Sequence, residues 1–330
     1  MSQMCFWLEN HSQIGQRSLE DVIGIVGAQM NALGHHAVWD INQRDKMVPR
    51  ENGINVLVEG FTERSIAIIA QMHAAGARFL ILATEEPTPK GFNWGTQKEM
   101  IYRQEMFPRA AKYAEGIIHL VPGEHVASWY GQFAPTAYTE LGYAPSLMRD
   151  DGTVPDYDFG FYGSLTPRRH RLLKKLANKT NKQKAIKIMA DFGSQQDRDH
   201  QMRRAKVIVQ LRKFDAMGLV SSSRCNTALS LGRPVIAEPH DLSHPWDEVV
   251  RFSETEESFI DEAMMMCAMW KPVYQTQLAA FKEKFPPEAC IGAALEKLGI
   301  GQEAPRAPKA SSGILALRRK QALYGVTRFG

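Results

Sequence analysis

Residues 158–176, with the sequence DFGFYGSLTPRRHRLLKKL, decide the fold class of this protein. The residues up to Gly163 are almost wholly apolar, which is typical of a strand in a parallel sheet that is covered on both faces. Ser164 and Thr166 then form a short polar turn, and Pro167 stands where a first helical residue is expected. The stretch therefore predicts a β-strand, a turn and an α-helix in direct succession.

The same succession recurs on both sides of this stretch. Apolar runs predict strands over residues 36–40, 54–59, 78–83, 116–121, 158–163, 185–190, 206–211, 234–238 and 249–252. Helical spacing predicts helices over residues 18–33, 62–75, 97–114, 167–178, 195–204, 223–231 and 254–270, the first of them N-capped by Ser18. Strands that alternate with helices imply right-handed βαβ units. We therefore predict an α/β protein with two tandem Rossmann-like, doubly wound parallel sheets that face a cleft.

The alternation lapses between residues 141 and 158, where prolines, glycines and acids follow one another without periodicity. Such a stretch is typical of a domain boundary. We predict a Rossmann-like N-terminal domain over residues 1–148, a second α/β domain over residues 149–285, and a helical, basic tail over residues 286–330.

Length and composition place the chain among ordinary globular proteins. Its 330 residues are 44% hydrophobic and 23% charged, which excludes the disordered and fibrous classes. It contains no uninterrupted apolar run long enough to cross a bilayer, and its first residues lack the pattern of a signal peptide. Its four cysteines have neither metal-ligand nor disulfide-framework spacing. We expect a cytoplasmic protein with reduced thiols and no transmembrane segment.

Positive charge is concentrated in two segments. Residues 301–330 contain six Lys or Arg and one acid, and residues 168–187 contain nine Lys or Arg and no acid. Two interpretations of the second segment stay open: a solvated helix face, or a surface that binds phosphates.

The opening of the helix predicted at Pro167 is a candidate anion site. Free backbone N–H groups and the positive end of the helix dipole attract an anion there, and arginine can hold a phosphate through two hydrogen bonds. The candidate binding residues are Gly163, Ser164, Thr166, Arg168 and Arg169. In the alternative interpretation the hydroxyl side chains only cap the helix and the arginines are solvated.

A second helix start has the same character. Residues 220–238 read VSSSRCNTALSLGRPVIAE, so a serine-rich turn leads into a helix that ends at Gly232, and a strand restarts at Pro234. Ser222, Ser223 and Arg224 lie at this second helix N-terminus. Two such termini that face one crevice could hold a diphosphate, whereas the alternative is an ordinary N-cap with Arg224 in a structural ion pair.

These two motifs, about fifty residues apart, resemble the donor domain of GT-B glycosyltransferases, especially the glycosyltransferase family 1/4-like and CgeB-like groups. The segment NALGHHAV at residues 31–38 resembles their first helix–strand unit, and the resemblance covers about residues 18–270. It implies a hexosyl- or pentosyltransferase that takes a nucleotide-diphosphate sugar, such as a UDP-sugar, as co-substrate in the second domain. The acceptor, which could be a glycan, a small molecule or DNA, would bind the first domain. No metal and no tightly bound cofactor is expected.

The chain departs from that family pattern at one place. Many retaining members carry an acidic pair around the helix of the second motif, but Thr227 and Leu219 occupy those positions here. Glu238, at the end of the following predicted strand, is the candidate substitute, and Asn226 completes the predicted donor-binding set. Whether the reaction retains or inverts the anomeric configuration stays open.

The chemistry of sugar transfer suggests the catalytic residues. Negative charge builds on the leaving diphosphate, and Arg224 is the predicted catalytic cation. An inverting enzyme also needs a base at the acceptor hydroxyl. Glu59, Glu85 and Glu86 follow predicted strands of the first domain, and Glu59 is favoured because Gly60 allows close approach. Solvated surface carboxylates are the alternative interpretation. The weaker candidates are His119, His125 and His240.

Two further functions stay open. A glycosyltransferase-like enzyme of the phage type that modifies DNA bases would use the two basic segments to hold its substrate. A non-catalytic sugar-nucleotide-binding protein would explain the absence of the acidic pair. Two Asp-x-Asp matches, at Asp156 and Asp197, resemble the metal site of a different glycosyltransferase fold, and we interpret both as coincidence.

Overall fold

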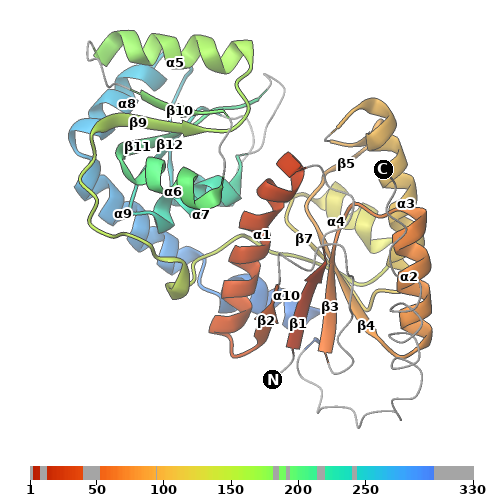
Figure 1. Cartoon of the computed structure of the whole chain (residues 1–330). Helices are drawn as coiled ribbons and strands as arrows, with labels where there is room; N and C mark the ends of the chain where they lie inside the picture. Colours follow the sequence, from red (N-terminus) through yellow and green to blue (C-terminus); the bar gives the residue numbers. More distant parts are fainter. Residues whose placement is uncertain are drawn as a thin grey trace, which may run out of the picture. The chain divides into compact units, whose positions relative to one another are not determined.

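The computed structural model describes residues 3–7, 13–39, 53–93, 95–180, 186–190, 194–213, 220–239 and 244–300. The chain divides into two compact units. Unit 1 contains the described residues within 1–16, 33–139 and 291–330, and unit 2 contains those within 17–32 and 140–290. Figure 1 shows the elements of both units, coloured along the sequence.

Unit 1 is built on a six-stranded sheet with the strand order β2-β1-β3-β4-β7-β8. Every pairing in it is parallel, so the carboxyl ends of all six strands lie at one edge. The strands are β1 (Gln3–Trp7), β2 (His36–Val38), β3 (Gly53–Val58), β4 (Arg78–Ala83), β7 (Ile117–His119) and β8 (Thr136–Tyr138). The order reverses at β1, as in doubly wound folds.

Capping fixes the start of two helices in unit 1. Thr62 and Thr96 each accept a hydrogen bond from the backbone N–H three residues on, and each forms a full capping box. The helices are α2 (Glu63–Ala74), α3 (Gln97–Ala111), α4 (Glu124–Gly131) and α10 (Ala293–Lys297), and a hairpin joins β5 (Pro87–Thr88) to β6 (Gly91–Phe92). Phe107 of α3 and Phe79 of β4 are fully buried in the core.

Unit 2 is built on a five-stranded parallel sheet with the strand order β10-β9-β11-β12-β13. The strands are β9 (Tyr157–Tyr162), β10 (Ile186–Met189), β11 (Ala205–Gln210), β12 (Val235–Ala237) and β13 (Arg251–Phe252). From β9 the chain moves to β10 on one side and later to β11 on the other. The order therefore reverses between β9 and β11.

Helices cover both faces of this second sheet (Figure 1). One core cluster joins the sheet to α5 (Pro167–Thr180) and α8 (Phe259–Ala268). The other joins it to α6 (Gln195–Arg203), α7 (Ser222–Ser230) and α9 (Trp270–Lys284). Residues of α1 (Gln13–Ala32) from Arg17 onward also belong to unit 2.

The predicted α/β class with two parallel sheets is confirmed, and most predicted elements are present. The helix predicted to start at Ser18 is wrong at its start, because α1 begins at Gln13. The helix predicted over residues 254–270 is also wrong in its limits, because α8 begins at Phe259 and α9 at Trp270. The strands and α-helices that the sequence did not predict are β1, β5, β6, β8, α4 and α9.

The compact units divide after Thr139 and after Cys290, whereas the predicted domain limits are residues 148 and 285. Those limits stay predictions about the functional domains. Within the predicted tail, a π-helical turn at Glu288–Gly292 precedes α10. The basic residues of 301–330 lie outside the described residues.

Candidate functional site

The reversal of strand order in unit 2 brings the first motif to the place where open α/β sheets bind ligands. Such ligands lie outside the carboxyl ends of the strands, at the point where the order reverses. β9 ends at Tyr162 and β11 ends at Gln210, and these two strands pair directly. Gly163 follows the first strand and Leu211 follows the second. The residues after these two strands therefore form the candidate site.

The structure places Gly163 against Arg224, so the two sequence motifs meet. Gly163 has a backbone φ of +127°, which residues with a side chain rarely adopt. A Cβ atom added there would lie 2.6 Å from Nη2 of Arg224. The absence of a side chain at Gly163 is therefore what allows the guanidinium to lie directly on the backbone.

Arg224 is half-buried, and its guanidinium lies 5.6 Å from the ring centre of Tyr162. Burial lowers its pKa, and the nearby Arg198 lowers it further. Among the described residues, no carboxylate forms an ion pair with this guanidinium and no acceptor takes a hydrogen bond from it. Arg224 thus presents a positive charge that the described part of the protein does not pair.

Arg169 lies beside Arg224 and is almost fully buried, with 3% of its surface exposed. Its Nη2 donates to the Leu211 carbonyl at 2.7 Å, and its Nη1 donates to the Ser164 carbonyl at 2.8 Å. Burial, and then repulsion from Arg224, lowers the pKa of Arg169 to about 10. The side chain therefore links the turn after β9 to the end of β11.

Lys213 is a third cation near Arg169 and Arg224, and it is not among the site residues predicted from the sequence. Its pKa is lowered by burial and then by Arg169 and Arg224. Its carbonyl accepts a hydrogen bond from the hydroxyl of Thr166 at 3.4 Å. Its position just after a predicted strand was the one signal that could have found it.

Arg169, Lys213 and Arg224 form what we call the cation cluster. Burial lowers the pKa of all three, and Arg224 adds to the lowering at the other two. A bound anion would offset both the mutual repulsion of these three cations and the cost of burying their charge. The cluster is therefore suited to hold a multiply charged anion.

Arg168 and Glu238, both predicted to contact a donor, bind each other instead. Nη2 of Arg168 lies 2.6 Å from Oε1 of Glu238, and both side chains are buried. Arg168 also pairs with Glu256 at 2.9 Å, and the backbone N–H of Arg212 donates to Glu238 at 2.6 Å. The charge of Arg168 is therefore balanced within the protein.

The predicted site residues of α7 differ in their environments. Ser222 and Ser223 are half-buried in its first turn, where Ser223 lies 3.2 Å from the hydroxyl of Ser221. Asn226 is 1% exposed, and its amide nitrogen donates to the carbonyls of residues 141 and 142 at 2.9 and 2.6 Å. Its side chain is therefore occupied by the backbone just past the division between the units.

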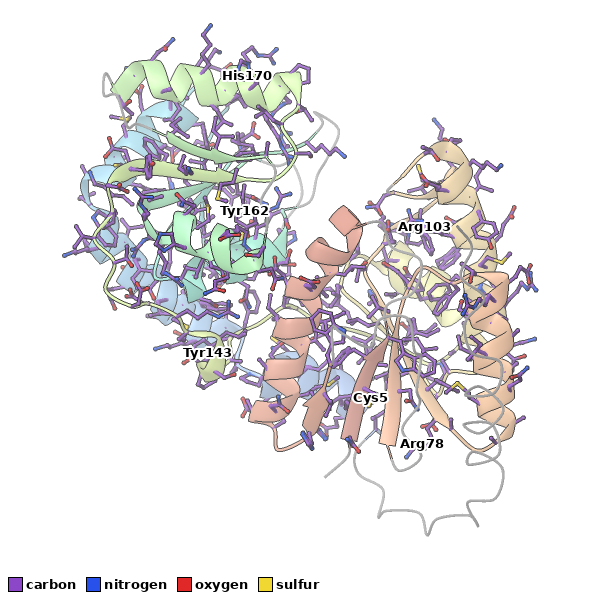
Figure 2. All side chains as sticks on the ribbon, viewed as in Figure 1. Cys5, Arg78, Arg103, Tyr143, Tyr162 and His170 are labelled. Carbon is purple, nitrogen blue, oxygen red and sulfur yellow. The ribbon has the colours of Figure 1, made fainter. Side chains whose placement is uncertain are left out.

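The ring of Tyr162, which Figure 2 labels, lies near two arginines, of which Arg224 is one. Arg198 also lies near this ring, with the guanidinium 5.2 Å from the ring centre. Arg198 is 1% exposed and pairs with Asp21 at 2.5 Å and with Asp199 at 2.6 Å. Asp21 and Asp199 thus balance the charge of Arg198. The neutralised guanidinium of Arg198 packs near the ring of Tyr162.

At the carboxyl edge of the unit 1 sheet, Glu59 and Glu85 are buried together. Glu59 is 1% exposed and accepts a hydrogen bond from the hydroxyl of Thr84. Burial, and then the charge of Glu85, raises the pKa of Glu59 to about 8. Glu85 pairs with Arg103 at 2.5 Å, and its pKa is raised by burial although Arg103 opposes the rise. The interpretation of these two acids as surface carboxylates is wrong.

The other base candidates differ in exposure. Glu86 and His125 form an accessible pair, with Nε2 of His125 3.2 Å from Oε1 of Glu86. His119 is 2% exposed, its Nδ1 bonds the carbonyl of Val121, and burial lowers its pKa. His240 lies outside the described residues.

Within the described part of the chain, no group of three or more His, Cys, Asp or Glu could hold a metal ion. The first Asp-x-Asp match is used in ion pairs, Asp156 with Arg204 and Asp158 with Lys206. In the second match, Asp199 pairs with Arg149. No helix in the described ranges is long and apolar enough to cross a membrane.

Comparison with known proteins identifies the fold alone. No protein-family model and no curated protein matches the chain. Trehalose-6-phosphate synthase OtsA aligns with a TM-score of 0.54 at 9% identity, covering 93% of this chain and 100% of that one. The N-terminal domain of Candida albicans trehalose-6-phosphate phosphatase aligns with a TM-score of 0.51 at 8% identity, covering 90% and 96%.

A third structure is an S. aureus TarM mutant in complex with fondaparinux, alpha-GlcNAc-glycerol and UDP. It aligns with a TM-score of 0.47 at 10% identity over 77% of this chain, which spans 57% of that chain. The two parallel sheets and the OtsA alignment together give the class: this chain has the GT-B fold of glycosyltransferases, as the sequence resemblance implied.

Proposed function

We propose that this chain is a glycosyltransferase that binds a nucleotide-diphosphate sugar, such as a UDP-sugar, at the carboxyl edge of the unit 2 sheet. The observation that supports this most is the cation cluster of Arg169, Lys213 and Arg224. These cations lie at the point where the strand order reverses, and the guanidinium of Arg224 has no anionic partner among the described residues. A diphosphate matches that charge and that place.

The cluster also suits the chemistry of the leaving group. When the sugar leaves, negative charge builds on the diphosphate, and fixed cations stabilise it most effectively in a partly dehydrated site. Gly163, which lies against Arg224, and Ser222 and Ser223 in the first turn of α7 complete our proposed set. Arg168, Asn226 and Glu238 drop out of it, because the protein itself occupies their polar groups.

For an inverting reaction, we assign the base to His125 with Glu86 as its partner. Both side chains are accessible, whereas Glu59 and Glu85 are buried and an acceptor hydroxyl could not reach them in this structure. A carboxylate that accepts from an imidazole fixes the ring so that its other nitrogen can take a proton. This assignment applies only if the enzyme inverts.

Thermal denaturation with a nucleotide panel tests the proposal. A ligand that binds only the folded protein, at about 100 times its Kd, raises the free energy of unfolding by about 2.7 kcal/mol. For a unit of this size we expect the Tm to rise by about 5–10 °C with the matching nucleoside diphosphate or its sugar. The nucleoside monophosphate is the matched control. Equal shifts with mono- and diphosphates would contradict a diphosphate site.

Gly163→Ala tests the place of the arginine. The new Cβ would displace the Arg224 guanidinium, and a lost charged hydrogen bond is worth about 1.5–3 kcal/mol. We therefore expect inorganic pyrophosphate, measured by calorimetry, to bind about tenfold more weakly or worse. Gly152→Ala is the control, because Gly152 also has a positive φ but has open space around it. Equal affinity in the two variants would show that the contact with Arg224 is irrelevant to binding.

Turnover separates an enzyme from a sugar-nucleotide-binding protein. The donor that raises the Tm most is incubated with the full chain, and release of the nucleoside diphosphate is followed over time. Binding without release, across glycan, small-molecule and DNA acceptors, would favour the non-catalytic interpretation.

A further inference from the structure

The exposed side of helix α5 is rich in basic residues and carries no acid. The fourteen residues of the helix, PRRHRLLKKLANKT, include no acid. Arg171, Lys174, Lys175 and Lys179 are all exposed, and we call these four residues the α5 basic face. Figure 2 labels His170, which is exposed on the same helix next to Arg171. The α5 basic face lies within the basic segment at residues 168–187, and none of its four residues belongs to the proposed donor site.

Few carboxylates balance these charges. Lys179 lies 3.2 Å from Asp261 of α8, and both side chains are well exposed, so water screens the pair strongly. Across the described residues, no acid pairs with Arg171, Lys174 or Lys175. At least three fixed cations on this face are therefore available to an anionic partner.

The opposite side of α5 anchors the helix. Leu172, Leu173 and Leu176 are at most 2% exposed and pack in one core cluster with Phe159 and Phe161 of β9. The basic side chains thus project from a helix whose position is set by the core. A partner meets a preformed row of charges and does not have to order the helix first.

The spacing of the row matches a phosphate backbone. A helix rises 1.5 Å per residue, so Arg171 and Lys179 are about 12 Å apart along the axis. Double-stranded nucleic acid carries one negative charge per about 1.7 Å of its length, so it presents about seven phosphate charges over that distance. Residues three and four apart lie on the same side of a helix, so the four cations can contact phosphates together.

We propose that the α5 basic face binds the phosphate backbone of a nucleic acid. A membrane surface fits less well, because helices that lie in a bilayer interface bury an apolar side in it, and the leucines of α5 are already in the protein core. The contacts are to phosphates and involve no reading of bases. This inference does not depend on the donor site, because none of its four residues belongs to the cation cluster.

Salt-dependent binding of a mixed-sequence DNA duplex to the full chain tests the inference. Fluorescence anisotropy gives the affinity between about 50 and 200 mM salt. Each phosphate contact contributes about 0.9 to the slope of log K against log salt. The variant Lys174→Gln with Lys175→Gln is expected to reduce that slope by about 1.8 and to weaken binding at the lower salt concentration.

The matched control is Lys90→Gln with Lys98→Gln. Lys90 and Lys98 are exposed lysines of unit 1, so this variant loses the same net charge away from α5. We expect its slope and affinity to equal those of the wild type. An unchanged slope in the α5 variant, or equal losses in both variants, would overturn the inference. The inference would also be overturned if the chain bound anionic lipid vesicles through Lys174 and Lys175 and did not bind the duplex.

The two proposals fail separately. If the chain shows nucleotide-induced Tm shifts but does not bind the duplex, only the inference about the α5 basic face is contradicted. If it binds the duplex but shows no nucleotide-induced Tm shift, only the proposed donor site is contradicted.

Discussion

Arg224→Ala is expected to lower kcat/KM for the nucleotide-diphosphate sugar by about 10²–10³-fold while the protein stays folded. The guanidinium of Arg224 lies against Gly163 and has no anionic partner among the described residues, so in the proposed reaction its charge would stabilise the leaving diphosphate. Its removal also relieves repulsion on Arg169 and Lys213, so the loss should appear in activity and not in stability. Release of the nucleoside diphosphate, measured at several donor concentrations, gives the ratio.

Arg204→Ala is the matched control for this prediction. Arg204 also belongs to unit 2, where it pairs with Asp156 at 2.5 Å on the surface. Its replacement should leave kcat/KM within about twofold, since surface ion pairs contribute little. Arg224→Lys keeps the charge but loses the paired N–H groups, so we expect intermediate activity. Full activity in a folded Arg224→Ala variant would remove this residue from the mechanism.

Glu59→Gln is expected to stabilise the protein increasingly as the pH rises from about 5 to about 8. The carboxyl of Glu59 has a pKa raised from 4.5 to about 8, so the folded state keeps a proton that the unfolded state releases. The free energy of unfolding of the wild type therefore falls across that interval, by up to about 1.4 kcal/mol per pH unit. Below 4.5 both states are protonated and above 8 both are ionised, so the difference then stays constant. Glutamine has no proton to lose and can still accept from Thr84.

Scanning calorimetry between pH 5 and pH 9 gives the Tm difference between variant and wild type, which should widen with pH and then level off. The control is Glu105→Gln, which removes a carboxylate that is exposed on α3. Its Tm difference should not widen over the same interval. A constant difference for Glu59→Gln would mean that this carboxyl is already ionised at pH 5.

The sequence predicts the turn between β9 and α5 better than it predicts the ion pairs around that turn. The end of β9 and the start of α5 can be predicted from Gly163 and Pro167, because few other residue types fit the backbone geometry at those two positions. Arg168 and Arg169 are neighbours with the same chemistry, yet one is balanced by Glu238 and the other by backbone carbonyls. The partner of Arg168 lies seventy residues away in sequence, and no local pattern indicates it.

Unit 1 shows a different limit. β1 is only five residues long, QMCFW, and neither its alternation nor its flanking residues distinguish it from a loop. Its pairing with both β2 and β3 makes it a strand, which is a tertiary effect. Glu59 and Glu85 show the same limit. Their positions after predicted strands indicate the correct edge of the sheet. Their burial, however, depends on α3 and α4, which supply Arg103 and Tyr130 as contacts of Glu85.

The first turn of α5 also limits how the gene for this protein can change. Arg168, Arg169 and Arg171 each meet a different environment: a buried acid, the carbonyls at the strand ends, and solvent. One added codon between Thr166 and Arg168 would rotate every later side chain by about 100°. A lysine would then point into the core and a leucine into water, so we expect natural relatives to vary here by substitution and never by length.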